Sequence, residues 1–288
     1  MTSVTASSVR GARRDRGSAL SAVPVAWPTL LLTVVAWICF LGAVGIGELA
    51  AWWLAVPGVV LGGFIAFTPM HDAAHRSVAK ARRVSEVTGR LAGVILLAPF
   101  PAFRWIHLEH HKHTNEAGAD PDFYSGAGPR WQLPLRWLTQ DLHYYWVYLR
   151  QVERPRRERL EAIGTLLGSY VALAALALAG HWQFVVAWLI GARLAIALLA
   201  FAFDYLPHAP HDVVQKQDRY RATTLIDHGW LTPVLLYQNY HLIHHLYPGV
   251  PFYRYARVFE ERRADLVKRG ARKRKLFGAA QPLDDRDS

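Results

Sequence analysis

Long apolar stretches alternate with basic and polar segments along the chain, and their lengths predict helices that cross a membrane. The first stretch runs from about residue 27 to residue 46, and the second ends near Pro69, after the short turn GELAAW. A second pair covers residues 162–179 and 182–203 and is joined at Gly180-His181. About twenty apolar residues cross a bilayer as a helix. The pattern therefore predicts an all-α integral membrane protein with four transmembrane helices, arranged as two hairpins.

Shorter elements are predicted between the two hairpins, at the level of the membrane surface. The segment 91–100, LAGVILLAPF, is apolar but too short to span, and Pro99 and Pro101 interrupt it, so we expect an interfacial or re-entrant element. Residues 131–150 mix tryptophan and tyrosine with charged side chains, which is typical of an amphipathic helix among the lipid headgroups. Residues 230–237 have a similar composition over a shorter length.

The placement of charge predicts the topology. The formal net charge is +11, yet the two hairpin turns contain no Lys or Arg. By the positive-inside rule both termini and the middle loop should be cytoplasmic, forming a histidine-rich cap on that side. We expect a disordered basic tail over residues 1–26, a membrane domain over 27–257 and a charged cytoplasmic tail over 258–288. The Ser- and Arg-rich opening also fits an organelle transit peptide. Basic clusters that flank apolar spans favour membrane lipids over nucleic acid as partners.

Composition excludes two other classes of protein. With 52% hydrophobic and 19% charged residues, gathered in long runs, a soluble domain with a single core is not expected. The only cysteine, Cys39, lies in the first apolar stretch, so neither an intrachain disulfide nor a thiolate metal cluster can form. Arg193 falls near the middle of the fourth stretch, and it should face a neighbouring helix or water because a charge facing lipid is costly.

Histidines carry the candidate chemistry. Three of the chain's motifs, HDAAH, HLEHHKHTN and HLIHHLYP, place imidazoles three or four residues apart, which brings them to one face of a helix. Eight rings converge in this way, too many for one octahedral metal, so the count favours a pair of metals. These eight candidate ligands are His71, His75, His107, His110, His111, His241, His244 and His245.

Other polar residues lie near these motifs. In DYLPHAPH, His208 could be a ninth ligand, with Asp204 one helical turn away to orient a ligand or hold a water. His113 and His211 are further candidates. Asp120 and Asp122 could orient imidazoles, although an Asp-Pro turn explains them as well. Imidazole suits Zn, Cu, Fe and Ni, and this number of neutral rings favours two non-haem iron ions with positions open for dioxygen.

The three motifs resemble the histidine boxes of the membrane fatty acid desaturase and hydroxylase superfamily, over residues 27–257. The continuation HKHTN, the segment LPHAPH and QNYHLIHHLYPGVPFYRY are most similar to the bacterial carotenoid ring hydroxylase branch. The resemblance implies that the eight box histidines bind iron, and that His208 matches the family's additional histidine. It also implies a bacterial inner membrane. The first box has three intervening residues where many acyl desaturases have four, which favours the carotenoid or acyl-lipid branches.

We therefore expect an enzyme that uses O2 and external electrons to oxidise unactivated C–H bonds of an apolar lipid. The first hypothesis is hydroxylation of a carotenoid β-ring, which needs a wide, blunt cavity. The alternative is an acyl-lipid desaturase with a narrow tunnel, and a remote alternative is a non-catalytic metal-binding membrane protein. No flavin, nicotinamide, haem or iron–sulfur motif is present, so a separate electron donor is expected, of ferredoxin type with its reductase.

Overall fold

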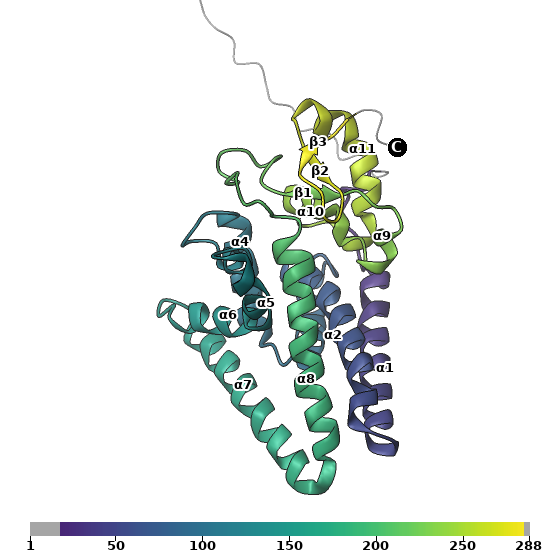
Figure 1. Cartoon of the computed structure of the whole chain (residues 1–288). Helices are drawn as coiled ribbons and strands as arrows, with labels where there is room; N and C mark the ends of the chain where they lie inside the picture. The colour runs from purple at the N-terminus through teal and green to yellow at the C-terminus, as the bar shows by residue number, and fades with distance from the viewer. Residues whose placement is uncertain (1–17, 285–288) are drawn as a thin grey trace, which may run out of the picture.

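Two long antiparallel helical hairpins form the body of the protein, and a compact cap closes one end of it (Figure 1). The structure is a computed structural model that describes residues 18–284. The hairpin helices are α1 (Trp27–Leu49), α2 (Trp52–Ala74), α7 (Arg156–Leu176) and α8 (Trp182–Leu199).

Three stretches are long and apolar enough to cross a membrane: α1, α2 and the fifty residues of Arg156–Tyr205. The third stretch reverses direction at Gly180, whose φ of 101° suits glycine, so it consists of α7 and α8 folded back on each other (Figure 1). The two predicted hairpins are therefore present. Large apolar side chains such as Leu31, Ile38 and Val171 lie exposed on α1 and α7, as expected of helices that face lipid.

Close packing joins the two hairpins. A Cβ atom at Gly63 of α2 would lie 2.8 Å from the Cβ of Ala195 on α8, so only glycine permits this approach. The hairpin turns also meet, because Glu48 and His181 lie 3.1 Å apart. Arg193 faces a neighbouring helix as predicted: it pairs with Asp141 and donates to the carbonyl oxygen of Leu138 at 2.9 Å. Its charge is thereby shielded from lipid.

The elements between the hairpins lie beside the bundle. The pair α3 and α4 bends by 103° between residues 95 and 100, which agrees with an interfacial or re-entrant element at residues 91–100. Residues 131–150 form two helices rather than one, because the chain leaves helical geometry at Thr139. The elements are α3 (Arg82–Ile95), α4 (Phe100–His113), the 3-10 turns η1 (Pro121–Ser125) and η2 (Arg130–Gln132), α5 (Leu133–Leu138) and α6 (Gln140–Leu149).

The cap, residues 206–284, follows a π-helical turn that extends α8. It contains a small sheet in the order β1-β2-β3, with β1 parallel to β2 and β3 antiparallel to β2. The chain is thus mostly helical, and the all-α prediction was wrong in this detail, because strands this short give no alternating pattern. The elements are the π turns η3 (Ala177–His181) and η4 (Ala200–Tyr205), β1 (Thr224–Ile226), α9 (Leu231–Val234), η5 (Gln238–Tyr240), α10 (His241–Leu246), η6 (Phe252–Arg254), α11 (Tyr255–Lys268), β2 (Arg272–Arg274) and β3 (Gln281–Pro282).

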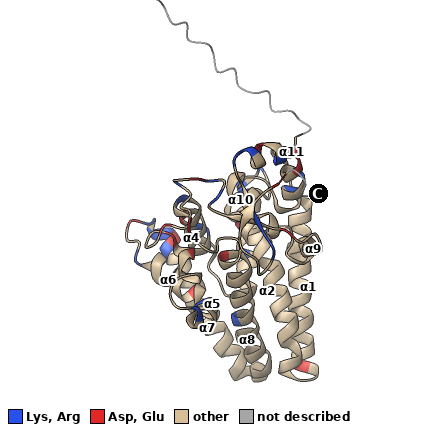
Figure 2. Ribbon diagram, turned by 45° about the horizontal axis from the view of Figure 1, so that its top comes forward, with Lys and Arg blue, Asp and Glu red and all other residues tan. Residues whose placement is uncertain are grey.

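Both predicted tails include folded residues. The boundary expected at residue 257 falls inside α11, whose Val258 and Leu266 are buried in the same apolar cluster as Leu242 of α10. At the other end residues 1–17 lie outside the described part, whereas the backbone N–H of Ala26 donates to Val78 at 2.7 Å. Charged residues gather at the cap and around α4 and α6, and the opposite ends of the hairpins carry few (Figure 2).

Candidate metal centre

Histidines from four separate segments meet where the bundle joins the cap. The end of α2, the inner face of α4, the short helix α10 and the loop after η4 each contribute at least one. On α4 and α10 the spacing of three and four residues places three rings on one side of each helix. Seven of the nine rings are buried, and His75 and His111 are partly buried. The nine predicted ligands are therefore all brought together.

The first set joins rings from α2, α4 and α10 through their Nε2 atoms. Nε2 of His71 lies 2.9 Å from that of His244, and Nε2 of His75 lies 2.8 Å from that of His107. His111 closes the set, with its Nε2 at 2.7 Å from His244 and 3.2 Å from His107. One nitrogen from each of four of these rings, those of His71, His75, His107 and His244, lies within 4.8 Å of the others, and His111 contacts two of the four.

The second set lies beside the first and contains His208. Its Nε2 is 3.0 Å from that of His241, which in turn is 3.1 Å from that of His245. His110 completes the set at 3.2 Å from His245. The four nitrogens lie within 4.8 Å of one another. The nine rings therefore form two adjacent groups of ligand atoms, as a pair of metals requires.

For three of the rings, contacts on the outer side indicate which nitrogen faces the centre. The Nδ1 atom of His110 lies 2.8 Å from Asp120, that of His244 lies 3.0 Å from the Tyr255 hydroxyl, and that of His245 lies 3.4 Å from Gln215. A neutral imidazole has one N–H, and a proton on Nδ1 leaves the Nε2 lone pair directed inward. Converging lone pairs repel one another unless a cation lies between them. This set of nitrogen donors therefore fits metal ions that prefer imidazole ligands.

Burial keeps the cap histidines neutral, which metal binding requires. It lowers the pKa of His208, His244 and His245 well below 6.5, with a further contribution from neighbouring histidines. The pKa of His241 falls to about 3 for the same reason. Since the folded-state pKa values are depressed, these rings carry no proton on their ligand nitrogens at neutral pH.

The remaining candidates lie outside both sets. His113 is 3.0 Å from Glu116, and His211 stacks on His208, with ring centroids 6.3 Å apart, and also contacts Tyr205 and Phe123. Asp122 lies 3.4 Å from Nδ1 of His110 and is grouped with it and Asp120. These positions give the two aspartates contact with a ring of the second set. His211 contacts the His208 ring but belongs to neither group of ligand atoms, and neither does His113.

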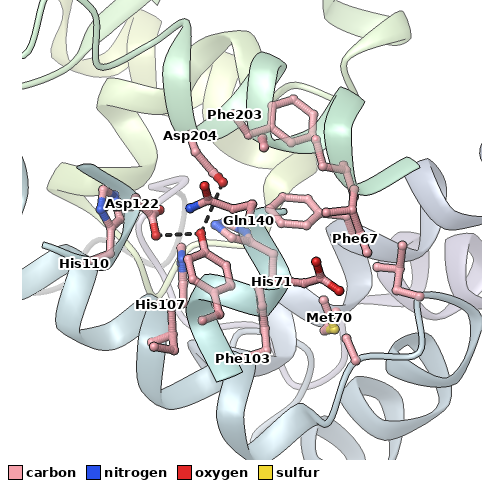
Figure 3. A pocket seen from close by; sticks show the side chains of 18 of the residues that line it. Phe67, Met70, His71, Phe103, His107, His110, Asp122, Gln140, Phe203 and Asp204 are labelled. Carbon is pink, nitrogen blue, oxygen red and sulfur yellow. Dashed lines mark hydrogen bonds and ion pairs between the residues drawn. The ribbon is translucent and has the colours of Figure 1, made fainter. Parts of the chain in front are cut away.

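Asp204 and Asp122 share one hydroxyl, that of Tyr144, which sequence reasoning interpreted only as an interfacial aromatic residue. The Tyr144 hydroxyl lies 2.6 Å from Asp122 and 3.1 Å from Asp204, and Figure 3 marks both contacts. Burial raises the pKa of Asp122 to about 6. Asp72, within the first histidine motif, was also missed; it accepts from Thr29 at 2.7 Å and ties α2 to α1. The presence of an acidic residue inside the motif HDAAH was the feature of the sequence that could have indicated this role.

An apolar cavity ends at both histidine sets (Figure 3). It lies between α2, α4, α6 and α8 and has a volume of about 70 Å³. Its walls are mainly aromatic and aliphatic, and histidines of the first and the second set line one end. The residues labelled in the figure that line it include Phe67, Met70, Phe103, Phe203, His71, His107, His110, Asp122, Gln140 and Asp204. A narrow apolar substrate can therefore reach both candidate metals.

Comparison with known proteins agrees with this geometry. Residues 50–277 match the family described as fatty acid desaturase. Two β-carotene ketolases of Paracoccus sp., strains N81106 and PC1, are 31% and 32% identical over 65% and 67% of this chain and 71% and 72% of theirs. An sn-1 oleoyl-lipid 12-desaturase of Picosynechococcus sp. is 26% identical over 81% of this chain and 75% of its own. The chain therefore belongs to the fatty acid desaturase family, and it is a membrane oxidoreductase with histidine clusters that could bind metal.

Proposed function

We propose that this protein is an O2-dependent di-iron membrane oxygenase that hydroxylates the ring of a carotenoid. The observation that carries the oxygenase function is the apolar cavity that ends on histidines of both sets, and the ring substrate is proposed from the similarity to β-carotene ketolases. The first iron would be held by the set around His244, and the second by the set around His208. When bound, the two irons supply the reductive activation of dioxygen that C–H oxidation requires.

The chain's own residues contribute positioning and the exclusion of water. The aromatic walls, among them Phe67, Phe103 and Phe203, offer an apolar surface that holds a hydrocarbon and leaves little room for solvent. Asp120 and Tyr255, at the Nδ1 atoms of His110 and His244, keep these rings turned so that Nε2 faces the centre. Geometry of this kind directs the oxidation to the substrate carbon at the end of the cavity.

Carotenoid and acyl substrates each have a supporting observation. The relatives of 31% and 32% identity are named β-carotene ketolases, which favours ring oxidation. The second candidate, acyl-lipid desaturation, is favoured by the small volume of the cavity, about 70 Å³, and by the relative named 12-desaturase. A metal-binding protein without catalysis is the weaker hypothesis, because the family consists of oxidoreductases.

Product analysis separates these functions. We expect expression in a host that accumulates β-carotene to yield a hydroxylated carotenoid, and a His110→Ala, His111→Ala variant to yield none. Pigments and total fatty acids are extracted together and identified by mass spectrometry. Detection of a ketocarotenoid would support oxidation of the ring but would contradict the proposal that the product is an alcohol. A new acyl double bond with unchanged pigment would assign the second candidate, and no new product of either kind would contradict both.

We further propose that the protein lies in a bacterial inner membrane, with both termini and the histidines on the cytoplasmic side. The support is the distribution of charge, since Lys and Arg concentrate at the cap end of the bundle (Figure 2). A basic surface on this side suits an acidic electron carrier of the ferredoxin type, supplied with electrons by its reductase.

Ionic strength tests the carrier hypothesis. Electrostatic encounter weakens as the Debye length falls from about 10 Å at roughly 0.1 M salt to about 3 Å at roughly 1 M. Turnover supported by a ferredoxin should therefore fall steeply with added salt, while oxidation driven by a small chemical reductant should not. Equal salt dependence of the two reactions would contradict the hypothesis that the carrier docks electrostatically.

A further inference from the structure

A second, arginine-rich cavity lies on another face of α4 from the one that carries its histidines. It has a volume of about 590 Å³ and lies between α3, α4 and the start of α7. Seven arginines and three glutamates line it, which leaves a surplus of four positive charges. Neither the candidate metal centre nor the apolar cavity uses these residues.

The glutamates of this cavity are already engaged. Glu86 accepts from Arg90 at 2.7 Å and from Arg104 at 2.9 Å and pairs with Arg82 at 3.5 Å. Glu161 accepts from Arg90 at 2.6 Å, and Glu158 pairs with Arg154. Within residues 18–284, by contrast, no carboxylate lies within ion-pair distance of the remaining uncompensated cations. These are Arg76, Arg83 and Arg157. An anion in the cavity would therefore meet free guanidinium groups from three segments.

The free guanidinium groups supply hydrogen-bond donors at the same place. A guanidinium group donates in a planar fork that matches phosphate oxygens. The set of free charges and free donors is therefore suited to a phosphate group.

Apolar surface lies within and beside the cavity. Phe100, Trp105 and Leu108 form part of its wall. Along α3 the side chains Val87, Leu91 and Val94 follow one helix face and are 56%, 45% and 40% exposed. A free inorganic anion or an acidic protein surface would engage the arginines but leave this stripe uncovered. A molecule with an anionic head and hydrocarbon chains satisfies both features.

We propose that this cavity binds the phosphate headgroup of an anionic phospholipid, whose acyl chains run along the exposed face of α3. Basic pockets between membrane helices at the headgroup level have the charge and position for such a ligand. The bound lipid would join α3 and α4 to the start of α7. Because α4 carries three candidate metal ligands on another face, the lipid would support the helix without contacting the centre.

Lipid binding by the full-length protein tests this proposal. Short-chain phosphatidylglycerol is titrated into the detergent-solubilised protein, and bound lipid is counted by native mass spectrometry. The Arg83→Gln, Arg157→Gln double variant should bind it about thirtyfold more weakly, roughly fivefold for each charge removed. Both side chains are exposed, so the substitutions leave the core intact. An Arg130→Gln, Arg262→Gln variant removes the same charge at exposed positions outside the cavity and should bind like the wild type.

Each alternative ligand gives a different result. Equal binding of phosphatidylcholine would show that the charge surplus does not select the lipid and would overturn the proposal. Inorganic phosphate that binds as tightly as phosphatidylglycerol would assign the cavity to a free anion. Unchanged lipid binding by the double variant, combined with slower ferredoxin-supported turnover, would assign the arginines to an acidic protein partner.

Discussion

Replacing His208 by alanine is expected to remove one of the two metal ions and to abolish turnover. The second set has four ligand nitrogens, and loss of His208 leaves His241 without its neighbour at 3.0 Å. Three remaining rings provide an incomplete shell, whereas the rings of the first set are untouched. We expect the metal content, measured by inductively coupled plasma mass spectrometry, to fall from two ions per chain to about one.

His211 provides a matched control three residues away. It is also a histidine of the segment after η4, but its ring packs near Tyr205 and Phe123 and outside both sets. The His211→Ala variant should therefore keep both metals and most of its activity. If the His208 variant retained two metals, or if the His211 variant lost one, the assignment of ligands in this segment would be incorrect.

The histidine cluster could be predicted because it depends mainly on the spacing of histidines within short segments of the sequence. Spacings of three and four residues place His107 beside His110 and His111 on one face of α4 whatever the rest of the fold does. The division between the two sets was not predictable. His110 and His111 are adjacent in sequence yet belong to different sets, since a helix turns by about 100° per residue and the partners come from α10 and the loop after η4.

The contacts made by the Nδ1 atoms and by the nearby carboxyl groups could not be predicted, because they depend on tertiary structure. Tyr255, which contacts His244, lies on α11, beyond the end of the third motif, and Gln215, which contacts His245, lies in a long loop. Tyr144 was interpreted as an interfacial anchor because aromatic residues at the headgroup level usually are. Its position between two buried carboxyl groups follows only from the packing of α6 against η1 and η4. The small sheet and the folding of residues 258–283 were missed for the same reason.

Replacing Asp120 by asparagine is expected to weaken metal binding by about ten- to a hundredfold, the range found when an outer partner of a metal-bound histidine is lost. Asp120 is buried, and its Oδ1 atom lies 2.8 Å from Nδ1 of His110. Asparagine offers one carbonyl oxygen in place of two carboxylate oxygens and no charge, so Nδ1–H of His110 loses a charge-assisted acceptor. Metal affinity is measured by competition with a chelator, using the wild type as reference.

A structural role for Asp120 has to be separated from its role at His110. The same carboxylate accepts the backbone N–H of Asn115 at 2.7 Å and that of Asp122 at 2.9 Å, so its loss could loosen the loop before η1. The melting temperature of the metal-free protein reports the loop alone. If Asp120 acts mainly by orienting His110, the metal-free variant melts near the wild type, and only the metal-loaded proteins differ. A Glu116→Gln variant, which removes a nearby surface charge, should change neither value. If the variant lost the same stability with and without metal, the role of Asp120 would be to hold the loop. The orientation of the His110 ring would then have to be explained by another contact.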